Sequence, residues 1–208
     1  MKVGIIGAGM IGQATASRLV AAGHEVMISN SRGPETLADL EQSLGQSAHA
    51  GTTEQAARFG DVVLVAIPLK AIGSLPAAAL AGQIVIDANN YYPGRDGEIA
   101  ELESGETTSS ELLARALPGA RVVKAFNTIY YRRIAHEGRP PGSAERLGVP
   151  MAGDDVAAKQ VVASLIDDMG FDPVDGGALA DGRRQQPDTP VYNQPLDAAG
   201  VRAALTRG

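Results

Sequence analysis

Cysteine and tryptophan are absent from the 208 residues, and histidine occurs only at positions 24, 49 and 136. Without cysteine the chain cannot form disulfides, thiolate metal sites, iron–sulfur clusters or a cysteine nucleophile. The three histidines are too scattered for a zinc motif, so we expect no metal site. No apolar run approaches the roughly 18 residues that a membrane-spanning helix requires.

Positive charge is also scarce, because 18 Lys and Arg stand against 24 Asp and Glu, a net charge of −6. Nucleic-acid-binding proteins normally carry a basic excess, so this balance argues against such a partner. The chain starts with MKVGIIGAGMIG and lacks the basic stretch that begins a signal peptide. We therefore expect a cytoplasmic protein that binds neither nucleic acid nor membranes.

Short apolar runs alternate with helical patterns along the chain. The runs are rich in β-branched residues and suit buried parallel strands. They cover residues 3–6, 26–28, 62–67, 84–86 and 122–125. Residues 10–22 have one apolar face before Gly23, and Ser109 and Ser110 are expected to cap a later helix. The alternation predicts an α/β fold of the Rossmann type, with a doubly wound, mostly parallel sheet.

A smaller unit follows near residue 147. Residues 149–152 and 171–174 are predicted strands, and the helix between them starts after Asp154 or Asp155. Residues 176–195 predict an ordered loop, and Asp197 is expected to cap a last short helix. We therefore divide the chain into a Rossmann domain, residues 1–146, and a small C-terminal α/β extension, residues 147–208. The extension is expected to close the site and is too small to be stable alone.

The motif G-x-G-x-x-G lies between the first predicted strand and the first predicted helix. This context is typical of dinucleotide-binding proteins, in which the glycines allow a tight turn and close approach of a pyrophosphate to the helix start. The alternative, an ordinary tight turn, is disfavoured by the context. The predicted cofactor-binding residues of the motif are Gly7, Ala8, Gly9, Met10, Ile11 and Gly12.

The second predicted strand ends in Asn30, Ser31 and Arg32, where an NAD-specific protein usually places an acid on the ribose. Asn30 and Ser31 can donate hydrogen bonds to a 2′-phosphate, and Arg32 can form a charge-assisted pair with it. The sequence therefore predicts NADP(H) as the cofactor of residues 1–146. The alternative is a solvated arginine beside a turn.

Other strand ends are expected to form the nicotinamide side of the site, because ligands bind beyond the carboxyl ends of parallel strands. The candidates are Ala66, Ile67, Pro68, Asn89, Lys124 and Asn127. Pro68 is a candidate apolar wall. Asn89 and Asn127 are candidates to orient a carboxamide or an acceptor, and Lys124 is a candidate to attract an anionic substrate. Turn, capping and snorkelling roles remain open for them.

These segments carry a family resemblance. VGIIGAGMIG at residues 3–12, VVLVAIP at 62–68, DANN at 87–90 and especially VVKAFNT at 122–128 resemble the NADP oxidoreductase, coenzyme F420-dependent family. The resemblance implies an NADPH-binding enzyme, often a homodimer, that passes hydride between nicotinamide and the deazaflavin coenzyme F420. A flavin is the acceptor in related ferric reductases. The family thus indicates the donor better than the small-molecule acceptor.

Two other functions stay open. Reduction of a small imine or carbonyl calls for a proton donor, whereas hydride transfer between stacked rings depends mainly on positioning. Tyrosines at positions 91, 92, 130, 131 and 192 are candidate donors, although packing is their more ordinary role. The alternatives to hydride transfer to a deazaflavin or flavin are an NADPH-dependent imine or carbonyl reductase and a catalytically silent NADPH sensor.

Overall fold

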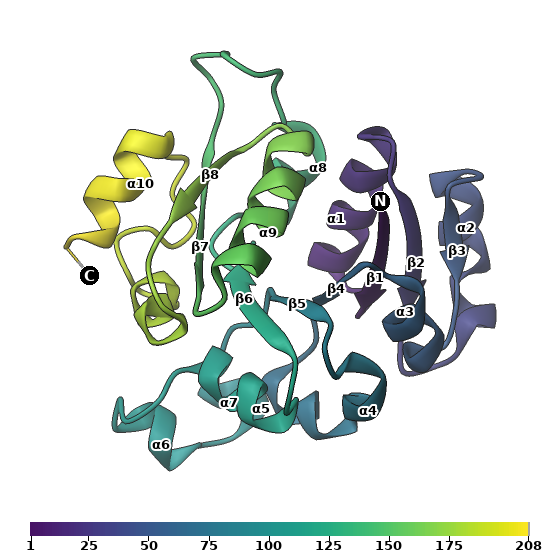
Figure 1. The fold of residues 1–208 in the computed structure, drawn as a ribbon, viewed down its shortest axis with the longest axis horizontal. Helices are drawn as coiled ribbons and strands as arrows, with labels where there is room; N and C mark the ends of the chain where they lie inside the picture. Colours follow the sequence, from purple (N-terminus) through teal and green to yellow (C-terminus); the bar gives the residue numbers. More distant parts are fainter. Residues whose placement is uncertain (208) are drawn as a thin grey trace.

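The computed structural model describes residues 1–207, so Gly208, the last residue of the predicted extension, lies outside the described residues. Residues 1–207 form an eight-stranded sheet in the order β3-β2-β1-β4-β5-β6-β7-β8 (Figure 1). The strands are β1 (Lys2–Ile6), β2 (Glu25–Ser29), β3 (Ala48–Ala50), β4 (Val62–Val65), β5 (Ile84–Asp87), β6 (Arg121–Ala125), β7 (Gly148–Gly153) and β8 (Asp172–Asp175). Strands β1 to β6 are parallel, β7 is antiparallel to β6, and β8 is parallel to β7. The predicted fold class is confirmed.

Helices cover both faces of the sheet (Figure 1). The α-helices are α1 (Met10–Ala21), α2 (Ala38–Leu44), α3 (Thr53–Phe59), α4 (Ala77–Leu80), α5 (Pro93–Asp96), α6 (Ala100–Glu103), α7 (Ser109–Ala116), α8 (Tyr131–His136), α9 (Val156–Asp168) and α10 (Ala198–Leu205). The 3-10 helical segments are η1 (Pro34–Leu37), η2 (Leu69–Ser74) and η3 (Leu179–Gln185). Among the helices of residues 1–207, none combines the length and the apolar character of a membrane span.

The sheet separates two hydrophobic clusters because successive side chains of a strand point to opposite faces. In β4, Val62 and Leu64 join the cluster under α1, α8 and α9, whereas Val63 and Val65 join the cluster under α3, α4 and α7. All four side chains are buried. A strand covered on both faces must be apolar at every position, which is why it was recognisable from its continuous apolar run.

Helix starts follow the predicted capping rules, with one correction. Asp155 and Asp197 accept hydrogen bonds from the backbone three residues later and cap α9 and α10, as expected. The expectation that Ser109 and Ser110 cap α7 is wrong. Thr108 is the cap, because the Glu111 side chain, three residues on, can accept a hydrogen bond from the Thr108 amide and complete a capping box.

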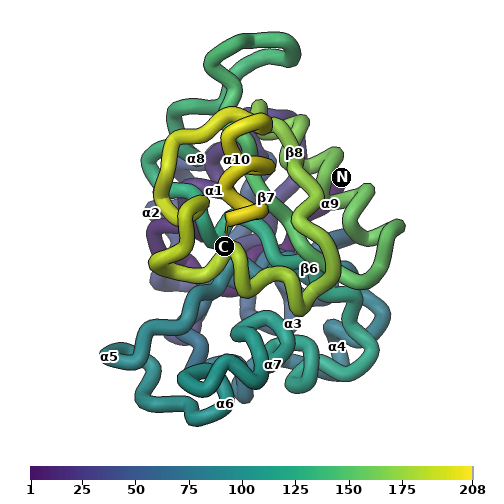
Figure 2. Tube along the Cα trace, turned by 90° about the vertical axis from the view of Figure 1, so that its left-hand side faces the viewer, coloured from purple at the N-terminus to yellow at the C-terminus, as the bar shows by residue number. Residues whose placement is uncertain are grey.

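The C-terminal extension continues the same sheet. Phe171 and Met151 belong to the hydrophobic cluster that contains Phe126 of the preceding part, and Phe171 is fully buried. Helix α10 packs on β7 and β8, and Figure 2 shows it lying over these strands, in yellow. Residues 1–146 and 147–207 therefore share one core.

We expect the whole chain to unfold in a single cooperative step, because the core is shared. Phe171→Ala should lower the free energy of unfolding by about 3 to 5 kcal/mol, the usual effect of removing a buried aromatic ring. Urea titration followed by circular dichroism measures this change. The control is Val156→Ala, whose side chain is exposed. Two separate transitions in the wild-type protein would contradict the shared core.

Candidate functional site

The carboxyl ends of β1 and β4 form the topological switch point of the sheet. These strands are neighbours, but the chain proceeds from β1 toward β2 on one side and from β4 toward β5 on the other. Open α/β sheets bind ligands in the crevice outside such a point. The backbone leaves β1 at Gly7 and β4 at Ala66, and a Cβ atom on Gly7 would overlap the Ala66 carbonyl.

The glycine motif has a different steric reason at each position. Gly7 has φ of 115°, in the region that favours glycine, and a Cβ atom on Gly12 would overlap the Gly7 carbonyl oxygen. Gly9 differs, because apart from Gly9 itself and its two chain neighbours no atom of residues 1–207 lies within 4 Å of the position its Cβ would take. Gly7 and Gly12 therefore build the turn, whereas Gly9 leaves space above it.

The start of α1 is open to an anion. Gly9 is the N-cap, and within the described chain neither a capping side chain nor an acidic residue occupies the first turn. The first amides of a helix have no partner inside the helix and carry its positive end. The Gln13 side chain donates to the Ala8 carbonyl over 2.8 Å and holds the loop below them. This arrangement favours a phosphate group.

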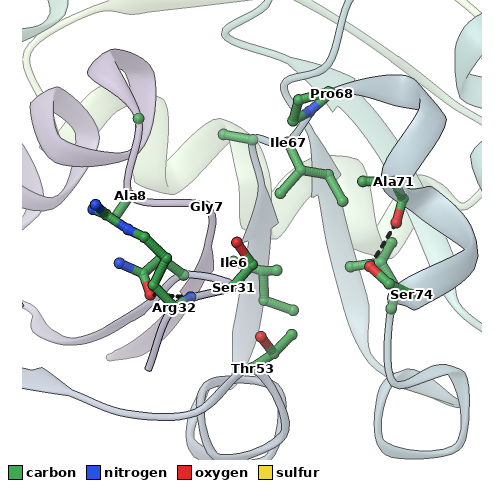
Figure 3. Close-up of a pocket in the computed structure, with 14 residues that line it drawn as sticks. Ile6, Gly7, Ala8, Ser31, Arg32, Thr53, Ile67, Pro68, Ala71 and Ser74 are labelled. Carbon is green, nitrogen blue, oxygen red and sulfur yellow. Dashed lines mark hydrogen bonds between the residues drawn. The ribbon is translucent and has the colours of Figure 1, made fainter. Parts of the chain in front are cut away.

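A cavity of about 270 Å³ opens beside this loop (Figure 3). We call it the Arg32 cavity. Its lining residues are Ile6, Gly7, Ala8, Gly9, Asn30, Ser31, Arg32, Thr53, Ala66, Ile67, Pro68, Ala71, Ser74 and Leu75. Figure 3 shows Ser31 and Arg32 on the side of the glycine loop, and Ile67, Pro68, Ala71 and Ser74 on the opposite side.

Asn30 shapes the loop that carries Arg32. Its Oδ1 accepts hydrogen bonds from the amides of Arg32 and Gly33, over 2.9 and 3.0 Å, and its Nδ2 donates to Thr36 Oγ1 over 2.9 Å. The side chain is thus already engaged, which corrects the expectation that it donates freely to a phosphate. Ser31 and Arg32 are exposed, and within residues 1–207 Arg32 forms no ion pair.

A second cavity, of about 350 Å³, adjoins the first, and we call it the Asn89 cavity. Its lining residues are Gly9, Met10, Ile11, Ala66, Ile67, Pro68, Ala88, Asn89, Asn90, Tyr92 and Arg95. Gly9, Ala66, Ile67 and Pro68 line both cavities. The two cavities together therefore form one crevice across the switch point.

Asn89 is held in one orientation at this second cavity. It is 2% exposed, and its Oδ1 accepts a hydrogen bond from the Ile67 amide over 2.8 Å. Within residues 1–207 its Nδ2 has no hydrogen-bond partner. A buried donor without a partner is destabilising, and such groups commonly mark a ligand position. The Asn89 amide can supply a hydrogen bond to a ligand in the cavity.

Lys124 lies behind Asn89 and does not line either cavity, so the expectation that it attracts a substrate is wrong. Its side chain is fully buried, and Nζ donates to the Asn89 carbonyl and to the hydroxyls of Ser109 and Ser110. Asp87 Oδ2 is 3.8 Å from Nζ. Burial lowers the pKa of Lys124, and the carboxylate of Asp87 opposes this effect. Lys124 therefore acts on the site through Asn89.

Asn127 is also buried and outside both cavities. Its Nδ2 donates to Asn90 Oδ1 over 3.0 Å and to the Gln185 carbonyl over 2.5 Å. The predicted contact of Asn127 with an acceptor thus has no support in its placement. Instead, the residue joins the chain just after β6 to the last residue of η3.

Several lining residues were missed by the sequence reasoning. They are Ile6, Thr53, Ala71, Ser74, Leu75 and Arg95. Thr53 begins α3 and is separated by two residues from β3, a strand of three residues that is too short to produce a recognisable apolar run. Arg95 follows the end of β5, so the DANN motif at residues 87–90 was the available signal.

The strand order, the glycine turn and the paired cavities define a dinucleotide-binding Rossmann protein. Residues 2–91 match the family described as NADP oxidoreductase, coenzyme F420-dependent. Over these residues the match confirms the resemblance to a family of NADP-dependent oxidoreductases that was predicted from the motifs. The match ends before residues 122–128, so the VVKAFNT motif is not part of it.

Similar proteins extend the comparison beyond the matched segment. The hypothetical protein SMa0349 from Sinorhizobium meliloti is 35% identical, with a TM-score of 0.80 and 93% of each chain covered. A structure from Arthrobacter sp. FB24, named as a candidate F420-dependent NADP reductase, is 28% identical, with a TM-score of 0.74 and coverage of 88% of this chain and 87% of that one. The metalloreductase STEAP3 of Rattus norvegicus is 35% identical over 88% of this chain. This chain spans 35% of the length of the rat protein.

Lys124→Met should lower the free energy of unfolding by about 3 to 5 kcal/mol, because it leaves the buried Asp87 carboxylate without its cation. Adding Asp87→Asn to this variant should restore part of the loss. Urea titration of the single and double variants measures both effects. The exposed Lys70→Met serves as the control. A single variant as stable as the wild type would show that the pair has no structural role.

Proposed function

We propose that the protein is an NADPH-dependent oxidoreductase that transfers hydride between NADP(H) and a deazaflavin, coenzyme F420, or a flavin. The observation that carries this proposal is the pair of adjoining cavities across the switch point, one beside Arg32 and one beside the unpartnered Asn89 amide. A dinucleotide has two ends of different chemistry and needs such a divided site.

The Arg32 cavity suits the adenosine end of NADP(H). The space above Gly9 and the free amides of α1 accommodate the pyrophosphate. Ser31 and Arg32 are exposed at the end of β2, where their side chains can bind the 2′-phosphate. The Asn30 side chain accepts a hydrogen bond from the Arg32 amide and so holds the Arg32 backbone in place for this contact.

The Asn89 cavity suits the nicotinamide end. Asn89 Nδ2 can donate to the carboxamide oxygen, while Met10, Ile11 and Pro68 supply apolar walls that exclude water. When bound, the nicotinamide supplies the hydride, and the protein contributes orientation rather than the redox chemistry itself. Because the protein need only orient the ring, most residues that line the Asn89 cavity are apolar or glycine.

The acceptor is proposed from the family and from the Arthrobacter relative rather than from a group in the cavity. It would lie over the nicotinamide, at the end of the Asn89 cavity formed by Tyr92 and Arg95. The homodimer and the cytoplasmic location expected from the sequence remain predictions.

The direct test mixes the purified protein with NADPH and either oxidised coenzyme F420 or FMN and follows the loss of NADPH absorbance. We expect saturable turnover with one of these acceptors and slower turnover with NADH. Saturable NADPH binding without turnover of either acceptor would refute the proposed activity while leaving the cofactor assignment intact.

Arg32→Ala should weaken NADPH binding by about 1.5 to 3 kcal/mol, or roughly 10- to 150-fold in the dissociation constant, because a hydrogen-bonded charge partner is lost. NADH binding should change little, since NADH has no 2′-phosphate. Fluorescence titration of each cofactor measures both values. Arg58→Ala, an exposed arginine on α3, is the matched control. Equal losses for NADPH and NADH would disprove the phosphate contact.

A further inference from the structure

Two tyrosines that are 100 residues apart meet at the Asn89 cavity. The hydroxyls of Tyr92 and Tyr192 are 2.5 Å apart. Tyr92 lines the cavity and is 36% exposed, whereas Tyr192 is more buried. The pair therefore lies where the nicotinamide end of the crevice meets the C-terminal segment.

Tyr192 is held in place by its chain neighbours. Val191 is buried in the small cluster under α10, and the Asn193 amide donates to the Thr128 carbonyl over 2.8 Å. Asn193 has φ of 56°, the left-handed conformation that asparagine tolerates better than most residues. The segment around Tyr192 is thus joined to the end of β6.

Tyr92 is positioned from the opposite side by Arg95. The Arg95 guanidinium lies over the Tyr92 ring, 4.9 Å from its centre. Arg95 is itself oriented by an ion pair with Asp96 at 2.8 Å and by a hydrogen bond to the Asn90 carbonyl at 2.7 Å. The ring and the hydroxyl of Tyr92 are therefore both fixed before any ligand enters.

The hydroxyl pair leaves one proton unused. Two neutral hydroxyls carry two protons, and the hydrogen bond between them uses one. Burial, together with the hydrogen bond to Tyr92 and the nearby charges, raises the pKa of Tyr192, so this hydroxyl stays protonated. Either hydroxyl can donate within the pair. When the half-buried Tyr192 donates to Tyr92, the remaining O–H is that of Tyr92, which lines the cavity.

We propose that Tyr92 is the hydrogen-bond and proton donor to the hydride acceptor and that Tyr192 is its positioning residue. The inference rests on the proposed function and narrows the acceptor class to compounds that gain a proton as well as a hydride.

The proposed step balances as follows. The C4–H bond of the nicotinamide breaks, and hydride with its two electrons forms a new bond to the acceptor. The Tyr92 O–H bond breaks, and its proton forms a bond to a ring nitrogen or another heteroatom of the acceptor. NADPH is thereby oxidised and the acceptor is reduced by two electrons. Solvent returns one proton to the partly exposed Tyr92.

Tyr92→Phe keeps the ring under Arg95 and removes the hydroxyl. With NADPH and either oxidised coenzyme F420 or FMN, we expect kcat to fall about 100-fold, within the range of lost general acids. Tyr192→Phe should lower kcat about 5- to 10-fold, and the double variant should match Tyr92→Phe alone, because Tyr192 acts through Tyr92.

Two binding measurements separate this role from a structural one. The dissociation constant of NADPH should stay within twofold in all three variants. Binding of oxidised coenzyme F420 or FMN to protein saturated with NADP⁺, followed by fluorescence, should weaken about fivefold in Tyr92→Phe, as for one lost hydrogen bond. The control is Tyr91→Phe, whose hydroxyl bonds to Gly97 and Glu103 instead.

The outcomes are distinct. If the wild type turns over an acceptor and Tyr92→Phe keeps its kcat, the role of Tyr92 is refuted and the proposed function stands. If Tyr92→Phe lowers NADPH affinity together with kcat, the role of Tyr92 as donor to the acceptor is also refuted, since the residue would then bind the cofactor. If the wild type reduces neither acceptor, the proposed function fails and the role of Tyr92 fails with it.

Discussion

The structure of the site depends on one buried lysine. Lys124 on β6 is surrounded by the Asp87 carboxylate of β5, two serine hydroxyls of α7 and the Asn89 carbonyl. Desolvating a charge is strongly unfavourable, so a lysine in this position requires several correctly placed oxygen atoms at once. Meeting that requirement aligns the ends of two strands with the start of α7. This network also holds the Asn89 backbone, through Lys124 and Asp87, while the Ile67 amide holds the Asn89 side chain at the second cavity.

The two ends of the sheet contribute different parts of the site. The strands around the switch point supply the backbone turn and open amides that suit a dinucleotide phosphate. The other end contributes differently, because β7 and β8 bring η3 and the segment before α10 against the end of β6. In η3, Gln185 contacts Asn127. In the segment before α10, Tyr192 contacts Tyr92 and Asn193 contacts Thr128. The C-terminal extension therefore contacts Tyr92, a residue of the Asn89 cavity, and contributes to the core at the same time.

The electrostatics of the crevice are local. The chain has a net charge of −6, yet the proposed ligand is an anion. Its phosphates would meet the open end of α1 and the Arg32 side chain, both without an acidic partner in the described structure. Glu35 is close to this loop, because a Cβ atom on Gly33 would overlap its carboxylate. This carboxylate would repel a phosphate, so binding at this loop would depend on direct contact with Arg32.

The sequence by itself determined the strands from residue 3 to residue 125, except the short β3, and the glycine turn. It also determined the cap at Asp197 and limited the cap of α9 to Asp154 or Asp155. These features depend on backbone sterics and on side chains a few residues apart, which a single sequence displays. Only the tertiary structure decided that Lys124 is internal, that Asn30 shapes its own loop, and that Tyr92 meets Tyr192. Such outcomes depend on burial and on pairing between distant segments, and a lysine or tyrosine has the same local pattern whether its polar end meets water or another side chain.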